Sequence, residues 1–109
     1  MNLGQHQEAF SADLVQLLTY AMSKGYGVRM GEVQRTTEQQ EIYVKSGRSK
    51  TMKSQHLNKT AADLHFTKDG KICYPQELGN FWVSLNPTLN QWGGNWKSFK
   101  DDPHFQRTV

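Results

Sequence analysis

The sequence has little cysteine, no long apolar run and no extended stripe of lysine and arginine. Cys73 is the single cysteine among 109 residues, so the chain cannot form an internal disulfide, and we expect it to fold in a reducing compartment. No apolar run approaches the ~20 residues that a membrane-spanning helix needs, so we expect no membrane span. The first residues, MNLGQHQEAF, lack the charged and apolar regions of a secretory signal. We therefore expect synthesis in the cytoplasm without a signal peptide.

Several familiar catalytic motifs are also missing. The chain contains no H-E-x-x-H, C-x-x-C, G-x-S-x-G or phosphate-binding loop. Ser54 has a histidine two residues away but no evident triad around it. These absences argue against a P-loop enzyme and against nucleophilic serine or cysteine catalysis.

The net charge of +3, with a pI of about 9.1, is only mildly basic. A nucleic-acid-binding domain usually has a stripe of lysine and arginine, and here the densest positive stretch is Lys45 to Lys53. We interpret this stretch as a solvated loop and expect no nucleic-acid partner. The alternative is that the loop attracts an acidic polymer.

Hydrophobic periodicity and turn signals predict one small α+β domain over residues 1–109. Apolar residues at helical spacing predict a helix over residues 6–24. A capping box at Thr37 and Gln40 predicts a second over 37–46, and Pro75 at a first turn predicts a third over 75–86. Side chains that alternate between two faces predict strands over residues 26–31 and 61–66. An Asp-Gly turn predicts a return strand over 71–74, and a further short strand is expected at the C-terminus. Residues 47–55 and 90–96 are predicted loops. Because no regular βαβ alternation occurs, we expect a small antiparallel sheet with flanking helices.

The segment SQHLNKTAADLHF places Asp63 on an otherwise apolar strand. An acid there is costly to bury unless a cation lies against it. His56 and Asp63 can converge on a metal ion only if the chain reverses between them, and Asn58 and Lys59 are suitable turn residues.

A metal site of this kind needs a third ligand. The candidate histidines are His6, which we expect to be exposed, His65 on the same strand face as Asp63, and His104 in DDPHF. From spacing alone, a His56–Asp63–His104 site remains one possibility. A salt-bridged surface aspartate beside unrelated histidines is the other.

Three motifs in order resemble those of a known peptidase family. SQHLNKTAAD resembles the S-x-H-x-x-x-x-A-x-D signature of zinc peptidases that act on bacterial cell-wall peptides, and DDPH resembles their second motif. RTTEQQ resembles the upstream Arg-Ser/Thr-x-x-x-Gln segment. The family includes D-alanyl-D-alanine carboxypeptidases of the vancomycin-resistance type and phage L-alanyl-D-glutamate endopeptidases. Thr60, where the carboxypeptidases commonly have glycine, and Asp101 in place of glutamate favour the phage endolysin branch, as does GGNWKSFKDDPHFQ.

The resemblance implies a Hedgehog/DD-peptidase-like fold and a zinc site. The implied zinc ligands are His56, Asp63 and His104. Asp101 would be the general base, and Arg35 a substrate or oxyanion contact, although a surface arginine is the alternative. Ser54 and Gln40 would support substrate binding. Trp92 and Trp96 either line the cleft or pack in the core, and we expect Asp102 to be a solvated turn residue.

The function implied is zinc-dependent hydrolysis of a peptidoglycan stem peptide. We expect the L-Ala–D-Glu bond to be cut by a monomeric phage or prophage endolysin. Such an enzyme would reach the cell wall after release by a separate, holin-type membrane-permeabilising protein. The alternatives are a D-Ala–D-Ala carboxypeptidase and a metal-stabilised module that binds the cell wall without cutting it.

Overall fold

The computed structural model describes residues 1–47 and 54–109, which contain three α-helices and five short strands. The helices are α1 (Leu3–Ser23), α2 (Thr37–Lys45) and α3 (Gln76–Leu85). The strands are β1 (Gly27–Met30), β2 (Ala61–Lys68), β3 (Lys71–Cys73), β4 (Asn90–Trp92) and β5 (His104–Arg107). Two short 3-10 helices, η1 (Gln55–Asn58) and η2 (Gly93–Asn95), complete the described elements. The predicted α+β class is confirmed.

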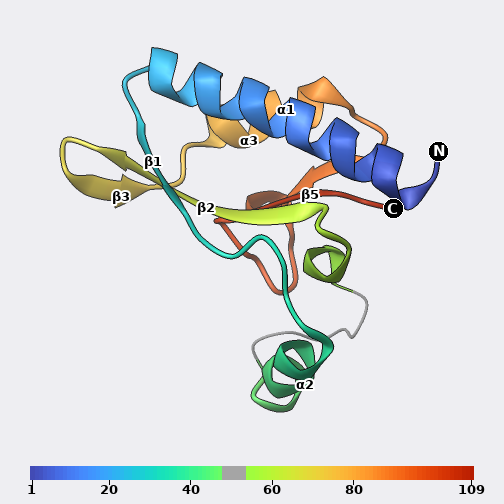
Figure 1. The fold of residues 1–109 in the computed structure, drawn as a ribbon. Helices are drawn as coiled ribbons and strands as arrows, with labels where there is room; N and C mark the ends of the chain where they lie inside the picture. The colour runs from blue at the N-terminus through green and yellow to red at the C-terminus, as the bar shows by residue number, and fades with distance from the viewer. Residues whose placement is uncertain (48–53) are drawn as a thin grey trace.

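The strands form one antiparallel sheet in the order β1-β2-β5-β4, with β3 paired to β2. β5, the last strand in the chain, therefore lies beside β2 in the middle of the sheet (Figure 1). In this register Asp63 on β2 is directly opposite His104 on β5. Two residues far apart in sequence thus become cross-strand neighbours.

The hydrophobic core lies between the sheet and the two helices that cover one of its faces, α1 and α3 (Figure 1). Phe10 from α1 and Phe105 from β5 both pack edge-on against the fully buried Trp82 of α3. The other buried core residues are Leu17, Ala21, Ala62, Leu64, Phe66, Leu78 and Trp92. Burial of each large side chain contributes about 1.5–3 kcal/mol. Because side chains alternate along a strand, the even-numbered residues of β2 from Ala62 to Phe66 face the core, and Asp63 and His65 lie on the opposite face.

The start of α1 and the cap of α2 differ from the sequence-based expectation. Helix α1 begins at Leu3, because the Asn2 side chain accepts a hydrogen bond from the Gln5 backbone and completes a capping box there. The capping box predicted for Thr37 and Gln40 is wrong. The N-cap of α2 is Thr36, and the Gln40 side chain is buried against Arg35 instead.

The predicted loop over residues 90–96 is also wrong in part, because it contains β4 and η2. Asn90 and Trp92 turn inward on β4 while Gln91 between them is exposed. The glycines that follow concealed this short alternation in the sequence. Residues 48–53, which hold most of the predicted 47–55 loop and of the Lys45–Lys53 basic stretch, lie outside the described residues. Across residues 1–47 and 54–109, no helix combines the length and apolar character needed to cross a membrane.

Candidate metal centre

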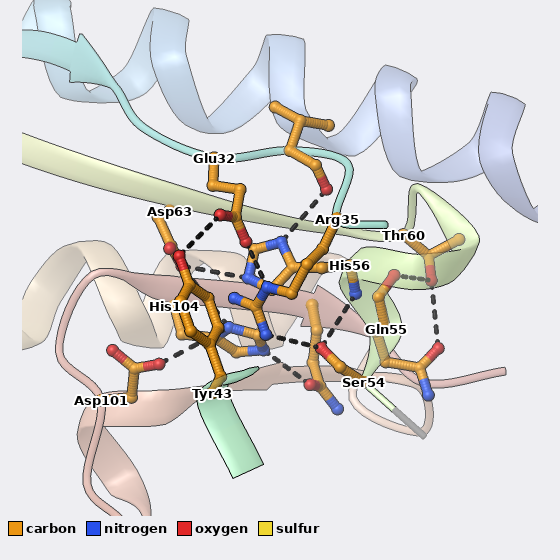
Figure 2. Close-up of polar contacts among 12 residues, drawn as sticks. Glu32, Arg35, Tyr43, Ser54, Gln55, His56, Thr60, Asp63, Asp101 and His104 are labelled. Carbon is orange, nitrogen blue, oxygen red and sulfur yellow. Dashed lines mark hydrogen bonds and ion pairs between the residues drawn. The ribbon is translucent and has the colours of Figure 1, made fainter. Parts of the chain in front are cut away.

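Three side chains from separate elements converge on the face of the sheet opposite α1 and α3. His56 comes from η1, Asp63 from β2 and His104 from β5, and one potential ligand atom from each lies within 4.8 Å of the others (Figure 2). The histidines are 1% and 5% exposed, so two imidazoles are buried beside an acid. The structure therefore brings together the three residues that the sequence motifs single out, and this His–Asp–His group could hold a metal ion.

A tight chain reversal makes this convergence possible. Ser54 caps η1 by accepting a hydrogen bond from the His56 backbone, and Lys59 ends η1 in the left-handed conformation at φ 58°. The buried Thr60 follows, and its hydroxyl donates to the Gln55 side chain at 3.1 Å. The reversal predicted at Asn58 and Lys59 is confirmed. Because Lys59 takes the left-handed conformation and Thr60 is held by Gln55, this reversal forms without a glycine at position 60.

Hydrogen bonding fixes which ring nitrogen of His56 faces Asp63. His56 Nδ1 lies 3.1 Å from the Val33 carbonyl oxygen, which can only accept, so Nδ1 carries the proton. In the neutral ring, Nε2 is then an unprotonated acceptor, and it faces Oδ1 of Asp63 at 3.2 Å. Neither atom has a hydrogen-bond partner within the described part of the chain. Two buried acceptors so close to each other require a cation between them, either a proton or a metal ion.

The distances fit a metal ion. Oδ1 of Asp63 is 3.2 Å from Nε2 of His56 and 3.6 Å from Nδ1 of His104. Ligands bound about 2.0–2.2 Å from a tetrahedral zinc ion lie roughly 3.3 Å apart. Imidazole nitrogen and carboxylate oxygen are both ligands that zinc accepts. The donor set and its spacing therefore suit this metal.

The two acids in contact with His104 have opposite pKa shifts. Burial alone would raise the pKa of Asp63, but its contacts with the His104 and His56 rings outweigh the effect of burial, so the pKa is well below its usual range. Burial and the charge of Asp63 raise the pKa of Asp101, against the opposing charges of His104, His56 and Arg35. Oδ2 of Asp101 is 3.8 Å from Nδ1 of His104. Asp101 is half-exposed and lines the cleft above the His–Asp–His group, so it remains open to solvent and ligand.

A polar cluster forms another wall of the cleft (Figure 2). The Arg35 guanidinium pairs with the Glu32 carboxylate, donates to the Gln40 amide oxygen and lies over the Tyr43 ring at 4.6 Å. A longer bond of 3.5 Å reaches the Ser54 hydroxyl. Arg35 therefore contacts both Gln40 and Ser54, the residues that the family resemblance assigns to substrate binding together with it.

Sequence reasoning missed Glu32 in this cluster. Its carboxylate contacts Arg35 through one oxygen and accepts from the Tyr43 hydroxyl at 3.3 Å through the other. Its backbone carbonyl also accepts from the Asp63 backbone. The available signal was an acid three residues before the motif arginine, at the end of a predicted strand.

The other two histidines lie outside the His–Asp–His group. His65 lines the cleft, and its Nδ1 is 2.7 Å from the Tyr74 hydroxyl. His6 was expected to be exposed but is half-buried, because its Nδ1 accepts a hydrogen bond from the buried Arg107 at 3.1 Å. Neither histidine supplies a third ligand here.

The two tryptophans near the second motif have different surroundings. Trp92 is a core residue, 4% exposed, that stacks on Phe105. Trp96 lines the cleft, with its ring centroid 5.1 Å from that of His104. Trp92 therefore packs in the core and Trp96 lines the cleft, the two roles that the sequence left open for these residues. Asp102 forms an exposed ion pair with Lys100 at 3.8 Å, as expected for a solvated turn residue.

Comparison with known proteins relates the chain to cell-wall peptidases. A family model described as D-alanyl-D-alanine carboxypeptidase matches residues 47–107. The L-alanyl-D-glutamate peptidase of Listeria phage A118 is 38% identical over 95 residues, which cover 84% of this chain and 34% of that protein. The chain thus spans about a third of that relative's length. The crystal structure of the Serratia marcescens L-Ala D-Glu endopeptidase ChiX superposes with a TM-score of 0.65 at 26% identity, covering 96% of this chain and 85% of that one. The chain belongs to the D-alanyl-D-alanine carboxypeptidase family.

Proposed function

We propose that this chain is a zinc-dependent peptidase that hydrolyses the L-Ala–D-Glu bond of peptidoglycan stem peptides. The observation that carries the proposal is the pair of unpartnered buried acceptors, His56 Nε2 and Asp63 Oδ1, with His104 Nδ1 beside them. A cation between these atoms explains this arrangement, and an open cleft lined by the half-exposed Asp101 adjoins it. In this proposal His56, Asp63 and His104 hold zinc.

The chemistry follows from the groups around the proposed metal. Zinc in such a site polarises a carbonyl oxygen and lowers the pKa of a water molecule towards about 7. Asp101 is the proposed general base. Its carboxylate accepts the proton that water loses on attacking the scissile carbonyl, and then donates that proton to the departing amine. Its raised pKa supports this role, because a base whose pKa is closer to neutrality can both take up and release a proton.

Arg35 is the proposed contact for negative charge on the substrate or on the oxyanion of the transition state. A guanidinium presents a planar positive charge with several N–H donors, and Glu32 and Gln40 hold its orientation at the cleft wall. Preorganised cations of this kind stabilise developing negative charge without rearranging during the reaction. Ser54 and Gln40 act as supports of this wall, through their bonds to Arg35.

The bond we assign is the one in the names of the phage and Serratia relatives. A second candidate is removal of the terminal D-alanine, since the matching family model carries the carboxypeptidase description. Mass spectrometry of digested peptidoglycan separates the two. Cleavage at L-Ala–D-Glu yields a free peptide that begins with D-Glu, whereas a carboxypeptidase releases single D-alanine. Unchanged muropeptides in the presence of zinc would contradict both.

Further parts of the proposal concern the whole protein. We take residues 1–109 as one catalytic domain that acts as a monomer. The phage relative supports a phage or prophage endolysin, which would reach the cell wall through a holin-type partner. Size-exclusion chromatography with light scattering tests the monomer, and lysis from within host cells, with and without a holin, tests the route.

A further inference from the structure

Gln106 contacts His104 from the side away from Asp63. It lies two residues after His104 on β5, so both side chains project from the same face of the sheet. The Gln106 amide oxygen is 2.7 Å from His104 Nε2. Gln106 is 9% exposed and His104 5% exposed, so water competes little for this contact.

Two further contacts set the orientation of the Gln106 amide. Its nitrogen donates to the Thr108 hydroxyl at 2.9 Å and to the Gln91 amide oxygen at 3.3 Å. In this arrangement both donor hydrogens are used, and the amide oxygen faces His104. An amide oxygen can only accept, so His104 Nε2 carries the proton and Nδ1 is left unprotonated towards Asp63.

We propose that Gln106, held by Thr108 and Gln91, is the positioning residue that fixes His104 in the tautomer competent to bind metal. This inference rests on the metal site of the proposed function. Metal-ligating histidines usually donate their second ring N–H to an acceptor that fixes ring orientation, and losing that acceptor costs about 10–100-fold in metal affinity. Val33 plays the corresponding part for His56 through its backbone carbonyl, which a side-chain substitution would not remove.

The side chain of Gln106 can be tested apart from its backbone role. The Gln106 carbonyl accepts a hydrogen bond from the Trp82 indole at 3.1 Å, and its backbone pairs with β2 and β4. The Gln106→Met variant keeps these contacts and the length of the side chain but removes the acceptor. The Gln106→Glu variant keeps an acceptor for His104. Gln16→Met, on the exposed face of α1, is the matched control for the same chemical change.

The experiment combines nitrogen NMR of the imidazoles in the metal-free protein, at a pH where they are neutral, with zinc affinity from chelator competition. We expect His104 in the Nε2–H form in the parent and in Gln106→Glu, and mixed tautomers in Gln106→Met. The zinc Kd should rise about 10–100-fold in Gln106→Met only. His56 should keep the Nδ1–H form in every variant, and Gln16→Met should match the parent.

The possible negative results distinguish the role of Gln106 from the proposed function. A parent that binds zinc but carries its His104 proton on Nδ1 when metal-free would overturn this inference without any variant. Unchanged tautomer and affinity in Gln106→Met would overturn it as well, while leaving the proposed function intact. A parent that binds no zinc would overturn the proposed function, and the affinity role of Gln106 with it.

Discussion

Asp63 and Asp101 place carboxylate oxygens 3.6 Å and 3.8 Å from the same atom, Nδ1 of His104, yet their pKa values move in opposite directions. Asp63 is stabilised as an anion by two imidazoles. Asp101 is half-exposed at the cleft and has a raised pKa. Pairs of acids with diverging pKa values mark a division of roles in many active sites. Here we assign Asp63 to the metal and Asp101 to proton transfer.

The Asp101→Asn variant should separate catalysis from metal binding. We expect it to retain zinc and to lose cleavage by about 10²–10⁴-fold, the usual contribution of a general base. Asp102→Asn, which removes the exposed ion pair with Lys100, should cleave like the parent. The measurements are zinc content and muropeptide release. An Asp101→Asn protein that cleaves at the parental rate would eliminate the general base and favour a non-catalytic binding module.

The raised pKa of Asp101 also predicts a pH dependence of stability in the metal-free protein. When the pKa of a carboxyl is higher in the folded state than in the unfolded state, protonation of that carboxyl stabilises the fold. This contribution to the free energy of unfolding is lost as the pH rises above the pKa of the unfolded state, about 3.9. The parent should therefore lose stability relative to Asp101→Asn as pH increases from about 4 towards neutrality. Urea unfolding of both proteins across this range measures the difference. A difference that does not change with pH would show that the folded and unfolded pKa values are equal.

Glu32 should be needed to hold Arg35 in place. In Glu32→Gln, the ion pair to Arg35 is lost, while an amide of the same shape remains near Tyr43. A hydrogen bond to a charged group contributes about 1.5–3 kcal/mol, so we expect cleavage to fall by roughly 10–100-fold if the loss is felt in the transition state. Zinc affinity should be unchanged. Glu38→Gln on the exposed surface of α2 is the control, and equal rates for both variants would contradict the role of Glu32.

Gly93 is predicted to be essential for the position of Asp101. A Cβ atom at residue 93 would lie 2.2 Å from the Asp101 carbonyl oxygen, and the Gly93 carbonyl accepts from the Asp101 backbone at 3.0 Å. Because the clash is with backbone, Gly93→Ala should destabilise the fold by about 1–3 kcal/mol and reduce cleavage in proportion to the fraction of chains that unfolds.

Gly4→Ala is the control for this change, since its Cβ would have 3.4 Å to the nearest atom, in Asn2. Alanine inside a helix should be neutral or stabilising by about 0.5–1 kcal/mol. Denaturant unfolding and muropeptide release measure both variants. If Gly93→Ala is as stable and as active as Gly4→Ala, the close approach to Asp101 has no consequence.

Much of the fold and the centre of the site could be predicted from local patterns. Alternation along residues 61–66 placed Asp63 on the face opposite the core, and the turn residues Asn58 and Lys59 indicated the reversal back from His56. Spacing alone left the third ligand open, because His104 reaches Asp63 only through the pairing of β2 with β5. The family resemblance, carried by three motifs in the same order, identified His104 as the third ligand.

What the sequence could not supply depends on contacts made in three dimensions. Gln106 gains its role from the pairing of β5 with β4, which brings Gln91 beside it, and from Thr108 just after β5; together these two residues fix its amide. β4 itself is three residues long and followed by glycines, so its alternation was too short to recognise. Glu32 lies in an irregular segment, where periodicity does not indicate the direction of a side chain.

Zinc binding by the parent and by Asp63→Ala is the most direct test of the His56–Asp63–His104 metal site. Both proteins are dialysed against zinc, and bound metal per chain is measured together with muropeptide release. We expect one zinc ion per parent chain, cleavage that a chelator stops and zinc restores, and neither bound zinc nor cleavage in Asp63→Ala. Full cleavage by metal-free protein, or equal zinc binding by a folded Asp63→Ala chain, would contradict this expectation.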